Sequence, residues 1–115
     1  MNDLEKKFYL EVKDAIKHFA KYTIDDIRGA KDTEFSAVKK ELEEIRKLNL
    51  SDNDLGNLQK IIEDAIIGAV HSIFVSIDGG TALSDEGKAL ELIDKKTGKP
   101  LTEGALHENF MEVFD

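Results

Sequence analysis

Histidine and aspartate are the residue types in this sequence that could perform acid–base chemistry. His71 and His107 are the histidines that could pair with Asp78 or Asp85 in the folded chain. A histidine held by a carboxylate can accept or donate a proton near neutral pH, provided that the side chains come within hydrogen-bond reach. The spacing of these residues in the sequence does not require their side chains to come so close in the fold. A small His/Asp-dependent enzyme is therefore the last of three functional hypotheses.

The acidic run at 52–54 is the only segment that resembles a metal-binding motif. A calcium-binding EF-hand loop has glycine at its sixth position, whereas Gly56 is the fifth residue counted from Asp52. The run suits a helix start better, because Ser51 and Asp54 have the spacing of a capping box. The segment 78–85 lacks the Gly-Lys-Ser/Thr ending of a phosphate-binding loop. We predict no catalytic residue, no metal site and no cofactor.

The charge balance is acidic, with 24 aspartate and glutamate residues against 16 lysine and arginine residues and a net charge of −8. Such a charge repels phosphate groups, so direct binding to nucleic acid or to an anionic membrane is not expected. Clustered acids would instead attract a basic protein. The length of 115 residues suits a single compact domain over 1–115. The absence of cysteine fits a reducing compartment, and we predict a cytoplasmic protein.

Apolar residues recur at helical spacing through the first half of the chain. They predict a first helix that stops at Gly29, with an inward stripe of Leu4, Phe8, Val12, Ile16 and Phe19. The segment 23–26 is either part of this helix or a capping box that opens a new turn. A second helix is expected from Asp32 or Thr33, with an inward stripe of Phe35, Val38, Leu42, Ile45 and Leu48.

The strongest helical periodicity follows the capping box at Ser51 and Asp54. Apolar residues over 55–77 fit one broad face, so this segment is expected to be the central core helix. Gly68 could allow a neighbouring helix to approach closely. The β-branched residues of 70–77 leave a strand as the alternative for that part.

From residue 88 the pattern changes from helical to extended. Residues 89–94 and 99–101 predict two strands joined by a turn at Gly98, although Pro100 confines the second strand to an edge. A short helix starting at Thr102 or Glu103 would follow. The predicted fold class is therefore α+β and mainly helical, with three longer amphipathic helices, a C-terminal β-hairpin and a short terminal helix.

Motifs in the last third of the chain suggest a relationship. The segment 70–114 looks like parts of small bacterial proteins in four places: Asp78-Gly79-Gly80, Leu92-Ile93-Asp94, Thr97-Gly98 and Leu106-His107-Glu108. In size and acidity the whole chain resembles the immunity proteins that neutralise bacterial toxins. This resemblance implies binding to a toxin rather than catalysis.

The first functional hypothesis is therefore a small acidic module that binds a protein partner, with a basic toxin as the partner that the resemblance implies. Candidate contact residues are acids on helix faces or in the loop after the third helix: Glu41, Glu44, Asp52, Asp78 and Asp85. The alternative is a structural or regulatory homo-oligomer without catalytic activity, in which one apolar helix face stays exposed for self-association.

Overall fold

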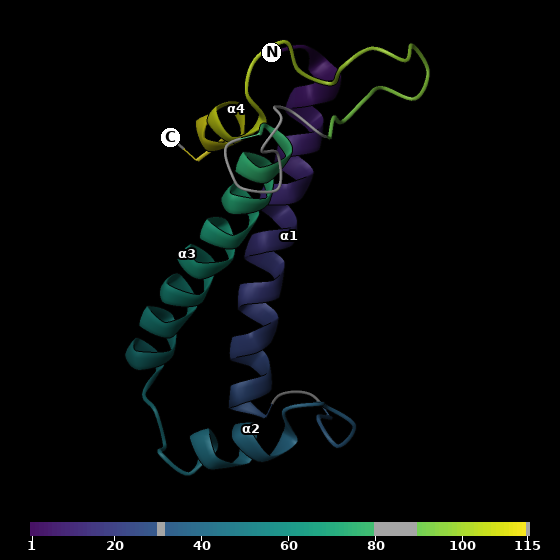
Figure 1. Cartoon of the computed structure of the whole chain (residues 1–115). Coiled ribbons are helices and arrows are strands. Elements are labelled where there is room, and N and C mark those ends of the chain that lie inside the picture. Colours follow the sequence, from purple (N-terminus) through teal and green to yellow (C-terminus); the bar gives the residue numbers. More distant parts are fainter. Residues whose placement is uncertain (30–31, 80–89, 115) are drawn as a thin grey trace. The chain divides into compact units, whose positions relative to one another are not determined.

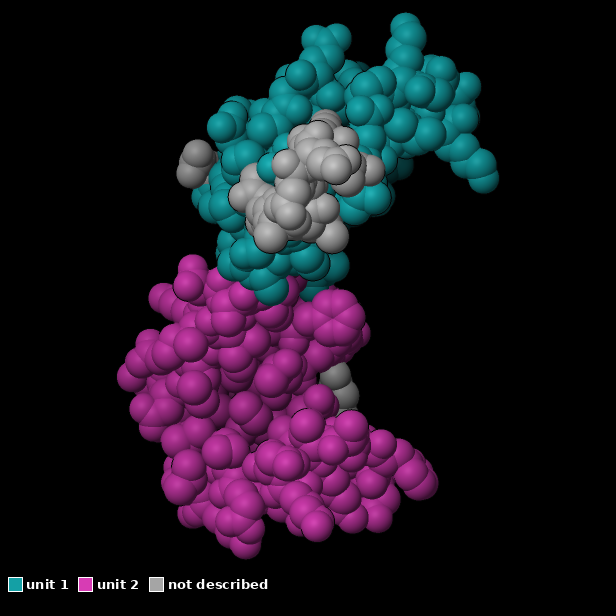
Figure 2. Space-filling view, in the orientation of Figure 1, with its two compact units in different colours: residues 1–15, 67–115 teal, residues 16–66 magenta. Residues whose placement is uncertain are grey.

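The computed structural model describes residues 1–29, 32–79 and 90–114, and this part of the chain contains four helices. These are α1 (Asp3–Arg28), α2 (Lys39–Arg46), α3 (Asp52–Ile77) and α4 (Leu106–Glu112) (Figure 1). No helix of the described ranges is long and apolar enough to cross a membrane. The chain divides into two compact units, residues 1–15 with 67–115 (unit 1) and residues 16–66 (unit 2) (Figure 2).

Unit 1 is built around aromatic rings from three helices. Tyr9 and Phe110 are fully buried, and Phe74 is 5% exposed. The rings of Phe74 and Phe110 meet edge to face with their centroids 5.1 Å apart, and Tyr9 lies 6.2 Å from each. Edge-to-face contacts of this kind add about 0.5–1.5 kcal/mol to the free energy gained by burial. The short helix α4 is therefore held in place mainly by Phe110 and the buried Leu106.

Unit 2 has a smaller, aliphatic core. Its buried residues come from the second half of α1, from α2 and from the start of α3, and they are Ile16, Ala20, Ile24, Leu42 and Leu55. Gly29 ends α1 with φ +77°, and the Arg46 side chain donates hydrogen bonds to the carbonyl oxygens of Asp26 and Ile27. The bond to Ile27 O supplies a partner for a carbonyl in the last turn of α1, while Asp26 O also accepts the Gly29 N–H at 3.1 Å.

The capping box that opens α3 is confirmed. The Asp54 backbone N–H donates to Ser51 Oγ at 3.1 Å, and the Ser51 backbone N–H donates to Asp54 Oδ2 at 3.2 Å. The stop at Gly29 is also confirmed, and segment 23–26 continues α1 rather than starting a new turn. Residues 70–77 are helical, so the strand alternative for them is wrong.

The predicted α+β class is wrong, because the described residues contain helices but no strand. Residues 90–101 form a turn with one isolated antiparallel bridge, Ile93 to Pro100. Backbone N–H groups of Asp94 and Leu101 donate to Lys99 O and Leu92 O, both at 2.8 Å. Toward the turn the pairing goes no further, because Asp94 O accepts the Gly98 N–H at 2.7 Å and the Lys99 N–H donates to Thr97 Oγ1. Part of the first predicted strand lies outside the described residues.

Two helix starts also differ from prediction, since α2 begins at Lys39 and α4 at Leu106. Before α2, Asp32 Oδ1 accepts the Glu34 N–H and Ser36 Oγ accepts the Val38 N–H. Before α4, Thr102 Oγ1 accepts the Gly104 N–H. Such local side-chain hydrogen bonds compete with helical ones and hold the chain in turns.

Candidate functional site

Three of the predicted contact residues lie in unit 2, on or just after α2. Glu41 and Glu44 are exposed, and Glu44 pairs with Lys47 at 2.8 Å. Asp52 is the first residue of α3, and its carboxylate pairs with Arg28 Nη1 at 2.6 Å while remaining 90% exposed. All three carboxylates are therefore accessible to a partner.

Large apolar side chains are exposed beside these acids. Phe35 is 95% exposed, Leu48 is 64% exposed, and Val38 and Ile45 also face solvent. Of the predicted inward stripe only Leu42 is buried. Glu41 and Ile45 are four residues apart and share one face of α2, and Val38 precedes the helix as its N-cap residue. We call the set Phe35, Val38, Glu41, Glu44, Ile45 and Leu48 the α2 surface.

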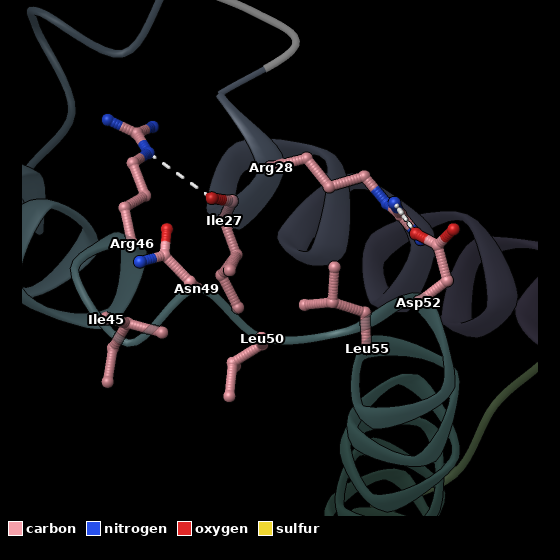
Figure 3. Close-up of a pocket in the computed structure, with 8 residues that line it drawn as sticks. All are labelled: Ile27, Arg28, Ile45, Arg46, Asn49, Leu50, Asp52 and Leu55. Atoms are coloured by element: carbon pink, nitrogen blue, oxygen red, sulfur yellow. Dashed lines mark hydrogen bonds and ion pairs between the residues drawn. The ribbon is translucent and has the colours of Figure 1, made fainter.

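A groove of about 370 Å³ continues the α2 surface through Ile45. Figure 3 shows its eight lining residues, which are Ile27, Arg28, Ile45, Arg46, Asn49, Leu50, Asp52 and Leu55. The bond from Arg46 to the Ile27 carbonyl lies near one end of the view and the Arg28–Asp52 pair near the other (Figure 3). Asp52 thus lines a groove next to the surface that carries Glu41 and Glu44.

The Asp78 carboxylate is buried and bonded within unit 1, unlike the other described candidates. Its side chain is 8% exposed, and it accepts the backbone N–H groups of Leu106 and His107, each at 3.0 Å. Burial acts to raise the pKa of Asp78, but the hydrogen bonds from His107 and Leu106 outweigh it, and the pKa lies below its ordinary value. The carboxylate caps α4. Asp85 lies outside the described residues, as does the rest of 80–89.

The structure brings together three of the residues considered for acid–base chemistry. His107 Nδ1 lies 2.5 Å from Asp78 Oδ2, and the rings of His71 and His107 meet edge to face at 5.5 Å. Helix capping accounts for the position of Asp78, and the enzyme hypothesis stays a prediction. No group of three or more potential metal ligands occurs in the ranges that the structure describes.

A buried polar network in unit 1 was not anticipated from the sequence. Glu5 is 3% exposed, and its Oε2 accepts hydrogen bonds from the Tyr9 hydroxyl at 3.0 Å and from Asn109 Nδ2 at 2.9 Å. Asn109 also donates to Thr102 Oγ1. Burial, followed by the hydrogen bond to Glu5, raises the pKa of Tyr9. One signal was present in the sequence, because Asn2 and Glu5 have capping-box spacing and Tyr9 follows Glu5 by four residues.

This network lies beside the largest of the grooves found. The groove has a volume of about 1110 Å³, and Glu5, Thr102 and Asn109 are among its lining residues. It is formed by the start of α1, the turn at 91–104 and α4. The structure therefore offers two candidate sites, the α2 surface in unit 2 and this groove in unit 1.

Comparison with models of protein families, with curated proteins and with solved structures found no match to the chain. The arguments for function therefore rest on the residues and their geometry.

Proposed function

We propose that the chain is an acidic protein-binding module that binds a basic protein partner through the α2 surface. The observation that carries the proposal is that Phe35, Glu41, Glu44 and Leu48 are all exposed within the single stretch of residues 35–48. Exposed apolar residues gathered in a patch and bordered by charged ones are typical of protein interfaces. A basic toxin is the partner that the resemblance to immunity proteins implies, and covering its active surface would neutralise it.

The two kinds of residue would contribute differently to binding. The carboxylates of Glu41 and Glu44 would speed encounter with a basic surface and select against acidic ones. Phe35 and Leu48 would supply most of the affinity, because their burial at an interface removes large apolar surface from water. The proposal also places the module in the cytoplasm, since a chain without cysteine suits a reducing compartment.

Capture of partners from a lysate of the source organism tests this proposal. The tagged chain should retain a basic protein in near-stoichiometric amount at about 0.1 M salt and less of it at about 1 M, where charges are screened within about 3 Å. The variant Glu41→Gln/Glu44→Gln should retain less partner at low salt. Asp14→Asn/Asp64→Asn is the matched control, because it removes two exposed carboxylates from α1 and α3.

A second matched pair of variants tests the apolar residues of the α2 surface. Leu48 and Ile61 are both 64% exposed, but only Leu48 belongs to the α2 surface. Leu48→Ser should therefore weaken capture, while Ile61→Ser should leave it unchanged. Equal capture by the wild-type chain and by both the charge and the apolar variants would contradict the proposal.

A homo-oligomer is the second candidate, and exposed apolar residues outside the α2 surface favour it. Phe19, Ile61 and Ile73 are each more than half exposed on α1 and α3. Self-association would remove such side chains from water at about 25 cal/mol per Å². Sedimentation equilibrium distinguishes the candidates, because the homo-oligomer predicts a mass above 12.9 kDa that falls on dilution, whereas the binding module is monomeric without its partner.

A further inference from the structure

Among the residues that the structure describes, the buried carboxylate of Glu5 has no cationic partner. No lysine, arginine or histidine of the described residues lies within ion-pair distance of it, and its hydrogen-bond donors, Tyr9 and Asn109, are neutral. A buried charge is costly unless it is paired. The position of Glu5 in the first turn of α1 offsets part of this cost, because the helix dipole favours negative charge there.

The direction of the Glu5 side chain is unusual for its position. Asn2 Oδ1 accepts the Glu5 backbone N–H at 2.8 Å, which is half of a capping box. In the other half of a capping box, the glutamate carboxylate would accept the backbone N–H of the N-cap residue. Here the carboxylate instead reaches Tyr9 and Asn109, which anchor it in the wall of unit 1.

One oxygen of this carboxylate remains available. Oε2 accepts both hydrogen bonds, and Oε1 accepts none from any residue that the structure describes. No side-chain oxygen or nitrogen there is both fully buried and without a partner, so Oε1 retains contact with solvent. Glu5 lines the groove of about 1110 Å³, and Oε1 is the carboxylate oxygen that remains for a ligand there.

The rest of the groove lining favours an organic cation. Glu91, Asp94 and Glu103 add three carboxylates, and among the described residues of the lining Lys99 is the only lysine or arginine. Apolar surface is present as well. A smaller cavity of about 410 Å³ shares Leu4, Asp94 and Leu101 with this groove. A long side chain with an apolar stem and a charged end would match both features.

We propose that this Glu5 groove binds a lysine side chain from an extended segment of a basic protein, with Glu5 Oε1 as the acceptor for the ammonium group. The proposal rests on the proposed binding of a basic partner and adds a second site, in unit 1. Lysine fits better than arginine, because a single free oxygen cannot satisfy the two-pronged guanidinium, whereas an ammonium group is a compact point charge. Leu4 and Leu101 would contact the aliphatic stem.

Titration of the ¹⁵N-labelled full chain with short peptides tests the proposal. The probe is an acetylated and amidated heptapeptide with one lysine between two leucines, and the comparison peptides replace lysine with arginine or norleucine. The lysine peptide should shift amide signals of groove residues and bind at least about tenfold more tightly than the norleucine peptide. The arginine peptide should bind more weakly than the lysine peptide.

Two variants assign the effect to Glu5. Glu5→Gln keeps an acceptor for Tyr9 and Asn109 but removes the charge, and it should lower affinity for the lysine peptide by about tenfold. Glu103→Gln removes an exposed carboxylate of the same groove and should lower affinity less than about threefold. If Glu5→Gln does not fold, comparison of the lysine and norleucine peptides on the wild-type chain still tests whether the groove recognises an ammonium group.

Several results would overturn the proposal: equal binding of the lysine and norleucine peptides, unchanged affinity in folded Glu5→Gln, or shifts confined to other parts of the chain. Tighter binding of spermidine than of the lysine peptide would reassign the site to free polyamines. Groove shifts that depend on protein concentration without peptide would reassign it to a second copy of the chain. Leu48→Ser should leave peptide binding intact, so failure of this site is distinguishable from failure of the α2 surface.

Discussion

Removal of the Asp78 carboxylate should weaken the attachment of α4 to unit 1. This side chain accepts two backbone N–H groups at the start of α4 and contacts the His107 ring, all while 8% exposed. Loss of a helix cap costs about 0.5–2 kcal/mol, and a hydrogen bond to a charged group contributes about 1.5–3 kcal/mol. The bonds share one carboxylate and do not add. We therefore expect Asp78→Ala to lower the free energy of unfolding by about 2–4 kcal/mol.

Asp78→Asn should cost less, about 1–2 kcal/mol, because its amide oxygen can still accept one N–H while its NH₂ faces a second donor. Asp52→Asn is the control, since that carboxylate is ion-paired but 90% exposed, and exposed pairs contribute at most about 1 kcal/mol. Urea unfolding followed by circular dichroism gives all three values. Equal stability of Asp78→Ala and Asp52→Asn would refute the assignment of Asp78 as the cap of α4.

Three further predictions concern other contacts of the fold. The pKa of Asp78 in the folded chain lies below the ordinary value of about 3.9, so the ionised carboxylate contributes its full stabilisation above that pH and loses it as pH falls through the folded pKa. The difference in free energy of unfolding between wild type and Asp78→Asn should therefore shrink below about pH 4. A difference that stays constant with pH would argue against a charged cap. Tyr9→Phe removes the hydroxyl donor to buried Glu5 and should lower the free energy of unfolding by about 1.5–3 kcal/mol in urea titrations, whereas no loss would mean that the bond contributes nothing. Gly29→Ala forces a side chain into φ +77° and should cost about 1–2 kcal/mol. Gly56→Ala should raise the melting temperature, because beyond its chain neighbours and the local helix backbone no described atom lies within 4 Å of the added carbon. The reverse order of stability would contradict these roles of the two glycines.

Local chemistry allowed several helix ends to be predicted from the sequence. Gly29 and the Ser51–Asp54 box act through their nearest neighbours, so their effects are visible in a short stretch of sequence. Local chemistry also caused two errors. Ser36 and Thr102 hold turns with their own hydroxyl groups where helices were expected. A pattern of apolar spacing does not report this competition.

The buried face of α1 could not be fixed by periodicity. The predicted stripe included Leu4 and Phe19, yet these are 49% and 63% exposed, while Glu5 and Tyr9 are buried. The difference arises because Glu5 is held by Asn109, 104 residues away in sequence. Pairing with so distant a residue changes which face is favourable to bury, and no local pattern contains that information.

Tertiary contacts also decide which acidic candidates are accessible and which one is buried. Glu41, Glu44 and Asp52 remain accessible, whereas Asp78 is taken up by the N–H groups of α4, 28 and 29 residues further along. Gly68 was expected to allow close approach of a helix, but no described atom lies within 4 Å of the position of its missing Cβ. Each outcome depends on tertiary contacts that sequence spacing does not specify.

The most direct test of the central claim is the association rate of the chain with its captured basic partner, measured by surface plasmon resonance from about 0.05 to 0.5 M salt. We expect the rate to fall steeply with salt, Glu41→Gln/Glu44→Gln to lower it and flatten its salt dependence, and Leu48→Ser mainly to speed dissociation. The control Asp14→Asn/Asp64→Asn should keep the wild-type slope. Identical salt dependence and dissociation for all four proteins would show that the α2 surface does not bind the partner.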